Sequence, residues 1–235
     1  MSGHSKWSQI KHQKGTADQK RARVFSKLSK AITVAARGGE NPDFNVRLRL
    51  AIEQAKKCNM PKDNIERAIA KGARKDAGSK ALEEILYEGF GPGGVAILIE
   101  TITDNRNRAS SSLKATLHKY GGSLAGSNSV QWMFEKKEVL VIEASEANEL
   151  AAIEAGADDV IKHNNELQII ITLAKNKEVK EKLTAAKIST LKETLEYIPT
   201  NKTKILKDAQ DSLGKLCAEL SDNEDVHAIY TNVTP

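Results

Sequence analysis

The segment from Val139 to Pro199 alternates predicted strands and helices in a complete series, which strongly restricts its fold. The spacing of apolar residues switches between about two for strands and about 3.6 for helices. The expected elements are strand Val139–Glu143, helix Glu146–Ala155, strands Val160–His163 and Leu167–Ala174, helix Lys177–Ala186 and strand Leu195–Pro199. This β-α-β-β-α-β order is typical of a split-βαβ, ferredoxin-like unit.

The chain on either side of this segment supplies the parts of a second such unit. Residues 81–134 predict strand Val95–Thr103, a helix to about Tyr120 and strand Ser129–Phe134. Residues 200–235 add a helix and a strand, Thr203–Leu220 and Val226–Asn232. We therefore predict a discontinuous α+β domain, 81–134 plus 200–235, with an α+β domain, 135–199, inserted into it.

Three helices are predicted before residue 73, and we expect them to form an N-terminal domain of residues 1–80. The first begins at about Asp18 and is stopped by Gly38-Gly39. Asn41 is expected to cap the second, with Pro42 at its first position. Its apolar residues, which start with Phe44, repeat at helical spacing and predict a buried face: Phe44, Leu48, Ala51, Ile52 and Ala55. Pro61 opens a third helix, Lys62–Lys71, which Gly72 is expected to end.

The first helix has an apolar side and a cationic side. At 100° per residue, one side gathers Val24, Leu28, Ala31, Ile32 and Ala35. A separate side gathers Lys20, Arg23, Lys27 and Lys30. The segment before it predicts a flexible basic arm with Lys6, Trp7, Lys11 and Lys14. The helix can therefore pack on a core and present a row of cations to a polyanion. The alternative is a solvated basic face that keeps the protein soluble.

The distribution of charge supports a polyanion as the partner of the N-terminal part. Residues 1–80 carry 19 Lys and Arg against 7 Asp and Glu, a net of +12, whereas residues 81–235 carry 17 against 24, a net of −7. Trp7 has two interpretations, stacking on a nucleobase or anchoring the arm to the body. Lys62 adds a charge at the start of the third helix, where free N–H groups also favour a phosphate. The acidic body is a candidate surface for a protein partner.

No catalytic or metal-binding pattern is found in the sequence. The five histidines are scattered, and neither Cys58 nor Cys217 belongs to a CxxC pair. Gly89, Gly91 and Gly94 formally satisfy GxGxxG, but they precede a strand instead of opening a helix, so we interpret them as a loop. We expect no cofactor, no metal and no enzyme activity. Two cysteines, no secretory signal and no apolar run of membrane length predict a cytoplasmic protein.

Several longer motifs resemble the YebC/PmpR family over essentially the whole chain. They are Ser2–Trp7, Ile10-Lys11, Asp18 to Leu28, Asn59–Ile69, Tyr87–Gly94 and Thr103–Arg108. The resemblance implies a three-domain fold and a cytoplasmic transcriptional regulator that binds DNA. It also implies a link to translation, since mitochondrial relatives are translational activators of cytochrome c oxidase subunit I and bacterial members are tied to the ribosome.

We therefore expect an α+β protein in which a three-helix domain precedes two ferredoxin-like domains, one inserted into the other. We expect a non-enzymatic, nucleic-acid-binding regulator of gene expression that acts on DNA. The alternative is a translation factor that contacts ribosomal RNA on the ribosome. Rivals from other classes are an enzyme for a small anionic ligand and a scaffold. The predicted nucleic-acid contacts are Lys6, Trp7, Lys11, Lys14, Lys20, Arg23, Lys27, Lys30 and Lys62.

Overall fold

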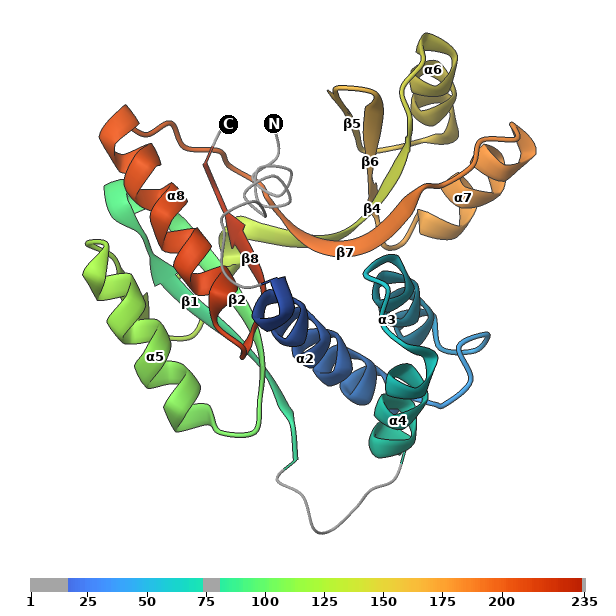
Figure 1. Cartoon of the computed structure of the whole chain (residues 1–235). Helices are drawn as coiled ribbons and strands as arrows, with labels where there is room; N and C mark the ends of the chain where they lie inside the picture. Colours follow the sequence, from blue (N-terminus) through green and yellow to red (C-terminus); the bar gives the residue numbers. More distant parts are fainter. Residues whose placement is uncertain (1–16, 74–80, 234–235) are drawn as a thin grey trace. The chain divides into compact units, whose positions relative to one another are not determined.

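The computed structural model of the chain describes residues 17–73 and 81–233 (Figure 1). These residues form two compact units. The first unit joins the described chain up to Gln131 to Ile205–Thr231, and the second joins Trp132–Lys204 to the chain from Asn232. Each unit contains its own four-stranded sheet, in which every strand pair is antiparallel. The expected α+β class is confirmed.

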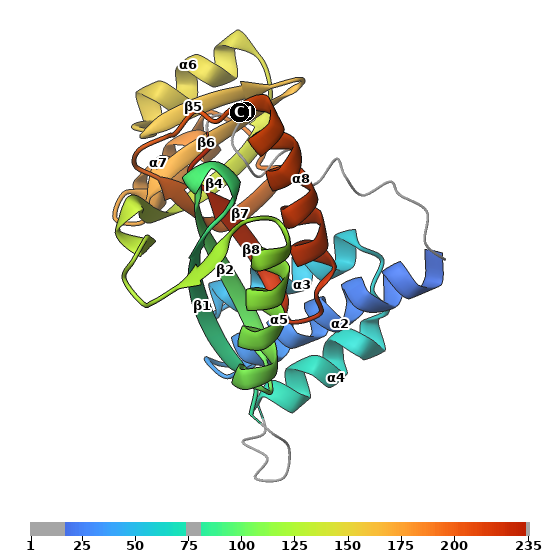
Figure 2. The ribbon, with the colours of Figure 1, turned by 90° about the vertical axis from the view of Figure 1, so that its left-hand side faces the viewer.

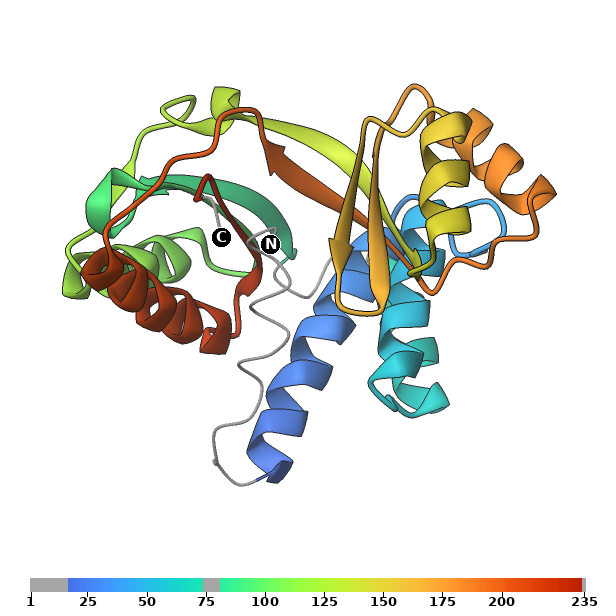
Figure 3. The ribbon, with the colours of Figure 1, turned by 90° about the horizontal axis from the view of Figure 1, so that it is seen from above.

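The second unit has the β-α-β-β-α-β order that the sequence predicts. Its elements are β4 (Phe134–Glu143), α6 (Glu146–Ala155), β5 (Asp159–His163), β6 (Glu166–Thr172), α7 (Asn176–Ala185) and β7 (Lys192–Pro199). The strands form sheet B in the order β5-β6-β4-β7, with the first and third strands of the unit in the centre. Helices α6 and α7 lie beside each other on this sheet (Figure 3) and bury a core that includes Leu140, Ile142, Ile169 and Val179.

The prediction of a strand at Ser129–Phe134 is wrong. The structure has a short 3₁₀ turn, η2 (Gln131–Met133), followed at once by β4, which begins at Phe134 and continues to Glu143. A single long strand therefore replaces the end of one predicted strand and the whole of the next. Phe134 and Val139 are both buried on β4, whereas the three residues between Phe134 and Glu138 are exposed or half-buried. In the sequence, these polar residues suggested that one strand ends and another begins. In the structure, the backbone pairs with β7 without interruption from Phe134 to Val141.

The first unit contains sheet A, whose strands come from two separate parts of the chain, residues 83–125 and 226–231. Its elements are β1 (Glu83–Phe90), the 3₁₀ turn η1 (Pro92–Gly94), β2 (Ala96–Thr103), α5 (Arg106–Lys119), β3 (Ser123–Ala125), α8 (Lys207–Asp222) and β8 (Val226–Thr231). The strand order is β3-β1-β2-β8. Helices α5 and α8 lie side by side on one face of sheet A (Figure 2).

Strand β1 corrects the prediction that the glycine-rich segment is only a loop. Its residues up to Phe90 pair with β2, and Gly89 also faces β3. A Cβ atom on Gly89 would lie 2.7 Å from the carbonyl oxygen of Ser123, so glycine permits the close approach of β3. With β1 included, sheet A has the same spatial order as sheet B. In sheet A, β1 takes the position that β6 has in sheet B. It differs from β6 in that it is the first strand of its sheet along the chain and not the third.

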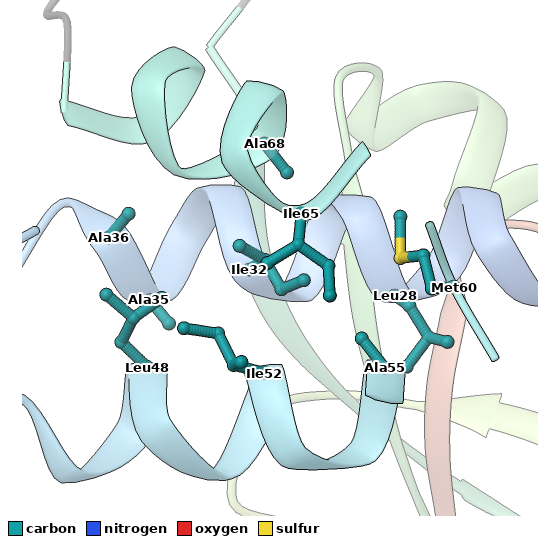
Figure 4. Close-up of a cluster of buried hydrophobic side chains, with 10 residues drawn as sticks. All are labelled: Leu28, Ile32, Ala35, Ala36, Leu48, Ile52, Ala55, Met60, Ile65 and Ala68. Atoms are coloured by element: carbon teal, nitrogen blue, oxygen red, sulfur yellow. The ribbon is translucent and has the colours of Figure 1, made fainter. Parts of the chain in front are cut away.

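Three helices precede sheet A and share one core, shown in Figure 4: α2 (Ala17–Ala36), α3 (Val46–Lys57) and α4 (Lys62–Ala73). The core contains three of the predicted inner residues of α2, Leu28, Ile32 and Ala35, and Val24 packs against it half-buried. The buried residues of this core are Leu28, Ile32, Ala35, Ala36, Leu48, Ile52, Ala55, Met60, Ile65 and Ala68. A further side of α2 packs on sheet A, where Ala31 and Val34 contact Ile102 of β2. Helix α2 therefore lies between its helical neighbours and the sheet (Figure 1).

The start of the second helix differs from the prediction. Asn41 forms a turn, in which its side-chain oxygen accepts from the N–H of Asp43, and Phe44 is 90% exposed. The cap is Asn45, whose side chain accepts from the N–H of Leu48 and donates to two carbonyl groups of the preceding segment. Because Asn45 both caps α3 and holds the loop to the end of α2, the helix begins four residues later than Pro42 suggested.

We retain as a proposal the division of the first unit into a helical domain, 1–80, and a discontinuous α+β domain, 81–134 with 200–235, beside an inserted domain, 135–199. Within the described ranges, no helix has both the length and the apolar character that a membrane span requires.

Candidate nucleic-acid interface

The predicted row of cations on α2 divides into two pairs. Lys20 and Arg23 are exposed, and neither side chain forms an ion pair or hydrogen bond with another residue in the described ranges. Lys27 and Lys30 are half-buried because the turn between α8 and β8 covers them. The helix therefore presents its first pair of cations to solvent and uses the second pair inside the molecule.

Lys27 binds the last turn of α8, and Lys30 binds the turn between α8 and β8. The Lys27 ammonium donates to the carbonyl oxygen of Ser221, and burial lowers the pKa of Lys27 to about 8. The Lys30 ammonium lies 2.8 Å from a carboxylate oxygen of Asp225 and 3.1 Å from the carbonyl oxygen of Glu224. Lys27 and Lys30 therefore attach α2 to the end of α8, in this conformation, with the same groups that were predicted to contact phosphates.

Asp225 is the centre of this attachment. Its side chain is 8% exposed and forms ion pairs with Lys30 of α2 and with Arg108 of the first turn of α5. The Arg108 guanidinium lies 2.9 Å from the Asp225 carboxylate. Arg108 also lies 2.9 Å from Asp104. Burial alone would raise the pKa of Asp225, but the hydrogen bonds from Lys30 and Arg108 outweigh it and lower the pKa below its usual value.

Replacing Asp225 by asparagine is expected to lower the free energy of unfolding by about 2 kcal/mol at neutral pH. The change leaves the ammonium of Lys30 partly buried without its counter-charge, which destabilises the folded protein. The loss of stability is smaller than for a fully buried ion pair, because the Arg108 side chain is exposed to solvent. Since the folded pKa is lowered, the carboxylate stabilises the protein above its unfolded pKa and loses that effect as the pH falls. Urea unfolding of both proteins across the acid range should show the difference shrinking. A difference independent of pH would contradict this account.

A groove of about 850 Å³ lies beside this ion-pair cluster, entirely within the first unit. Helix α2 contributes Ser26, Ser29, Lys30 and Thr33, and α4 contributes Asn64, Arg67, Ala68 and Lys71. The remaining lining residues come from the start of β1, the first turns of α5 and the α8–β8 turn: Leu82, Asp104, Arg108, Ser112, Asn223, Glu224 and Asp225. Almost all of the described lining residues are polar, and they include four cationic and three anionic side chains.

Three cations of this groove were not among the predicted contacts: Arg108, which binds Asp225, and Arg67 and Lys71 on α4. Arg67 is exposed and donates to the carbonyl oxygen of Asp63 and to the side chain of Asn64. Lys71 is exposed and forms no ion pair or hydrogen bond within residues 17–73 and 81–233. Asn64, Arg67 and Lys71 stand at i, i+3 and i+7, so they lie on one face of α4. This helical spacing is visible in the sequence and could have identified Arg67 and Lys71 as candidate contacts.

The groove brings together three of the sequence motifs. Ser26 belongs to the motif that ends at Leu28, and Asn64, Arg67 and Ala68 belong to Asn59–Ile69. Asp104 and Arg108 belong to the motif Thr103–Arg108. These stretches are separated by dozens of residues in the sequence, so only the packing of α2 between α4 and sheet A makes them neighbours.

Other predicted contacts lie apart from the groove or outside the described residues. The Lys62 side chain is 86% exposed at the start of α4 and lies 3.4 Å from Glu66, one turn along the helix. It does not line the groove. Lys6, Trp7, Lys11 and Lys14 lie outside the described residues.

Two further motif residues have clear structural roles. Asn105 caps α5, since its side chain accepts from the N–H of Arg108, as a strand-to-helix turn requires. Glu88 is 4% exposed on β1 and its carboxylate accepts from the N–H groups of Asn128, Val130 and Gln131. These three bonds explain why a carboxylate is buried on β1.

Metal and thiol chemistry have little support in the described part of the chain. No group of three or more His, Cys, Asp or Glu side chains there could hold a metal ion. Cys58 and Cys217 are both free, and burial raises the pKa of the Cys217 thiol far above its usual value. A thiol that stays protonated is a poor nucleophile.

Comparisons with known proteins find relatives along the whole chain. The family model for the TACO1/YebC N-terminal domain matches residues 5–75, and that for the second and third TACO1/YebC domains matches residues 82–233. A probable transcriptional regulatory protein of Desulfatibacillum aliphaticivorans is 46% identical over 99% of this chain and 96% of its own length. One of Syntrophus aciditrophicus is 41% identical over 99% and 95%.

A solved structure agrees with these sequence relatives. The crystal structure of a conserved hypothetical protein from Aquifex aeolicus is 41% identical to this chain. It superposes with a TM-score of 0.84 over 97% of this chain and 96% of that one.

Proposed function

The chain belongs to the TACO1/YebC family, and on that premise we propose that it is a nucleic-acid-binding regulator of gene expression and not an enzyme. The names of its relatives, probable transcriptional regulatory proteins, support regulation of transcription through DNA. The observation that carries the proposal is the exposed cationic start of α2, where Lys20 and Arg23 have no partner in the described ranges.

The physical basis of binding is the release of counterions from a phosphate backbone. A protein that neutralises phosphates frees condensed cations, so its affinity falls steeply with salt and depends little on base sequence. The net charge of +12 over residues 1–80 suits this mode of binding. The basic arm with Lys6, Trp7, Lys11 and Lys14 and the α4 start with Lys62 are proposed to add further contacts, whereas Lys27 and Lys30 would first have to leave the α8–β8 turn.

Replacing Lys20 and Arg23 together by glutamine is expected to flatten the salt dependence of DNA binding. Two phosphate contacts account for a slope of log affinity against log salt of about 1.8 on duplex DNA. The measurement is fluorescence anisotropy with a labelled duplex at several salt concentrations. The control replaces Lys162 and Lys192, two exposed lysines of the second unit, by glutamine, which removes the same charge. Equal slopes for the variant and the control would mean that the α2 cations are only solvated.

A paired experiment tests which polyanion is the target. Electrophoretic mobility shift on duplex DNA and co-sedimentation with ribosomes are measured with the same protein at the same salt. Tighter binding to DNA supports a transcriptional regulator, and tighter binding to ribosomes supports the alternative, a translation factor that contacts ribosomal RNA. Binding to neither would overturn the proposal. We place this activity in the cytoplasm, a setting that suits two free cysteines.

A further inference from the structure

We propose that the groove between α2, α4 and the α8–β8 turn holds a short stretch of single-stranded nucleic acid, with its phosphates against α4. The proposal rests on the proposed function, because it names the site where a strand would enter. The groove site is distinct from the contacts proposed above for the basic arm and for Lys20 and Arg23 at the exposed start of α2. The shared ligand chemistry is a phosphodiester strand, either RNA or DNA.

The α4 side of the groove provides the groups that a phosphate backbone needs. Asn64, Arg67 and Lys71 follow one another along one face of α4 and supply an amide, a guanidinium and an ammonium. Both cations are exposed, and Lys71 has no partner in the described ranges. A row of donors at successive helical turns suits an extended chain that carries one negative charge per unit.

The α2 residues between the two sides offer hydroxyl groups. Ser26, Ser29 and Thr33 lie on one face of α2 at helical spacing. Thr33 donates to the carbonyl oxygen of Ala68, whereas Ser26 and Ser29 form no hydrogen bond of their side chains within the described residues. Each free hydroxyl can donate one hydrogen bond and accept others, which suits sugar and phosphate oxygens.

The side opposite α4 has a different chemistry. The carboxylate of Asp225 is neutralised by Lys30 and Arg108, and that of Asp104 lies beside Arg108. Glu224 is exposed at the same turn. Carboxylate oxygens accept hydrogen bonds from the amino groups of bases such as cytosine. A strand that places phosphates against α4 and base edges toward this turn therefore meets complementary groups on both sides.

The size and lining of the groove favour a strand over a duplex. Its volume of about 850 Å³ falls in the range of about 300–1,000 Å³ that accommodates a drug-sized ligand, which matches a few nucleotides of one strand. Among the described residues that line it, only Ala68 and Leu82 have apolar side chains, and none has an aromatic ring. Recognition would therefore use the backbone and base edges and not stacking, which is the usual source of affinity in single-strand binders.

The first test measures binding of the full chain to labelled single strands of about ten nucleotides, within the usual site sizes of ~4–16. Lys71→Gln is expected to reduce the slope of log affinity against log salt by about 0.7. Ser29→Trp, which changes no charge but fills the groove, is expected to weaken binding about tenfold, a change of 1.4 kcal/mol. The matched controls are on α3: Lys56→Gln, an exposed lysine also in the last turn of a helix, and Gln54→Trp. Neither should change binding.

A second test uses the unmodified protein, so that it does not depend on the folding of any variant. Lysine acetylation is followed by mass spectrometry with and without the RNA and DNA oligonucleotides. Lys71 should be protected at least about fivefold more than Lys56, and the oligonucleotide that protects better identifies the source of the strand.

The outcomes separate this proposal from the proposed function. Equal acetylation of Lys71 with and without bound oligonucleotide would overturn the groove site while binding itself stood. Protection of Lys71 by duplex DNA alone would overturn the assignment to a single strand. Absence of binding to single strands, duplex DNA and ribosomes would overturn the proposed function, and the groove site with it.

Discussion

Replacing Gly72 by alanine is expected to lower the free energy of unfolding by about 3 kcal/mol. A Cβ atom at this position would lie 2.1 Å from the carbonyl oxygen of Thr33 and 2.8 Å from the Cβ atom of Ala36. Both neighbours belong to α2, and a backbone carbonyl cannot rotate out of the way. The two helices would have to separate, which would loosen the core shown in Figure 4.

The result also distinguishes two roles for Gly72. The sequence predicts that this glycine ends the third helix, whereas α4 continues through it to Ala73. A glycine that only ended a helix would cost little to replace, so a loss below about 1 kcal/mol would contradict the packing role. The matched control is Gly214→Ala in α8, where a Cβ atom would meet nothing within 4 Å. That change should stabilise the protein by about 0.5–1 kcal/mol, because alanine has the higher helix propensity. Urea unfolding measures both variants.

Replacing Glu88 by alanine is expected to lower the free energy of unfolding by about 4 kcal/mol. The carboxylate oxygens lie 2.6, 2.7 and 2.8 Å from the backbone nitrogens of Asn128, Val130 and Gln131. A hydrogen bond to a charged group contributes about 1.5–3 kcal/mol, and donors left buried without a partner add a desolvation cost. The whole turn that follows β3 would therefore lose its anchor to β1.

Hydrogen exchange gives a local readout for this variant. The amides of Val130 and Gln131 should exchange much faster in Glu88→Ala than in the unmodified protein, while Glu88→Gln, which keeps one acceptor oxygen, should fall between them. The control is Glu84→Ala on the same strand, because Glu84 pairs with Arg47 and their side chains are 39% and 54% exposed. That pair should contribute only about 0–1 kcal/mol. Equal losses for Glu84→Ala and Glu88→Ala would show that burial of the acid is unimportant.

Local patterns in the sequence predict much of the fold. The inner residues of α2, including Leu28, Ile32 and Ala35, are buried as their helical spacing indicates. The β-α-β-β-α-β order of the second unit is confirmed, because alternation of strand and helix periodicity within a few residues is enough to define it. The errors lie at element boundaries. Phe44 is exposed although its spacing fits a buried face, since the capping bond of Asn45 starts the helix after it.

Other features depend on residues that are far apart in the chain. The sequence places Lys27 and Lys30 on a cationic face, but their partners at Ser221 and Asp225 stand 194 and 195 residues later. Gly72 has its role only because α4 crosses α2 at Thr33. The groove exists only because α2 packs between α4 and sheet A. Periodicity reports which side of a helix is apolar, since that depends on neighbours within one or two turns. Which distant groups meet a polar face depends on the path of the whole chain, and the tertiary structure alone decides it.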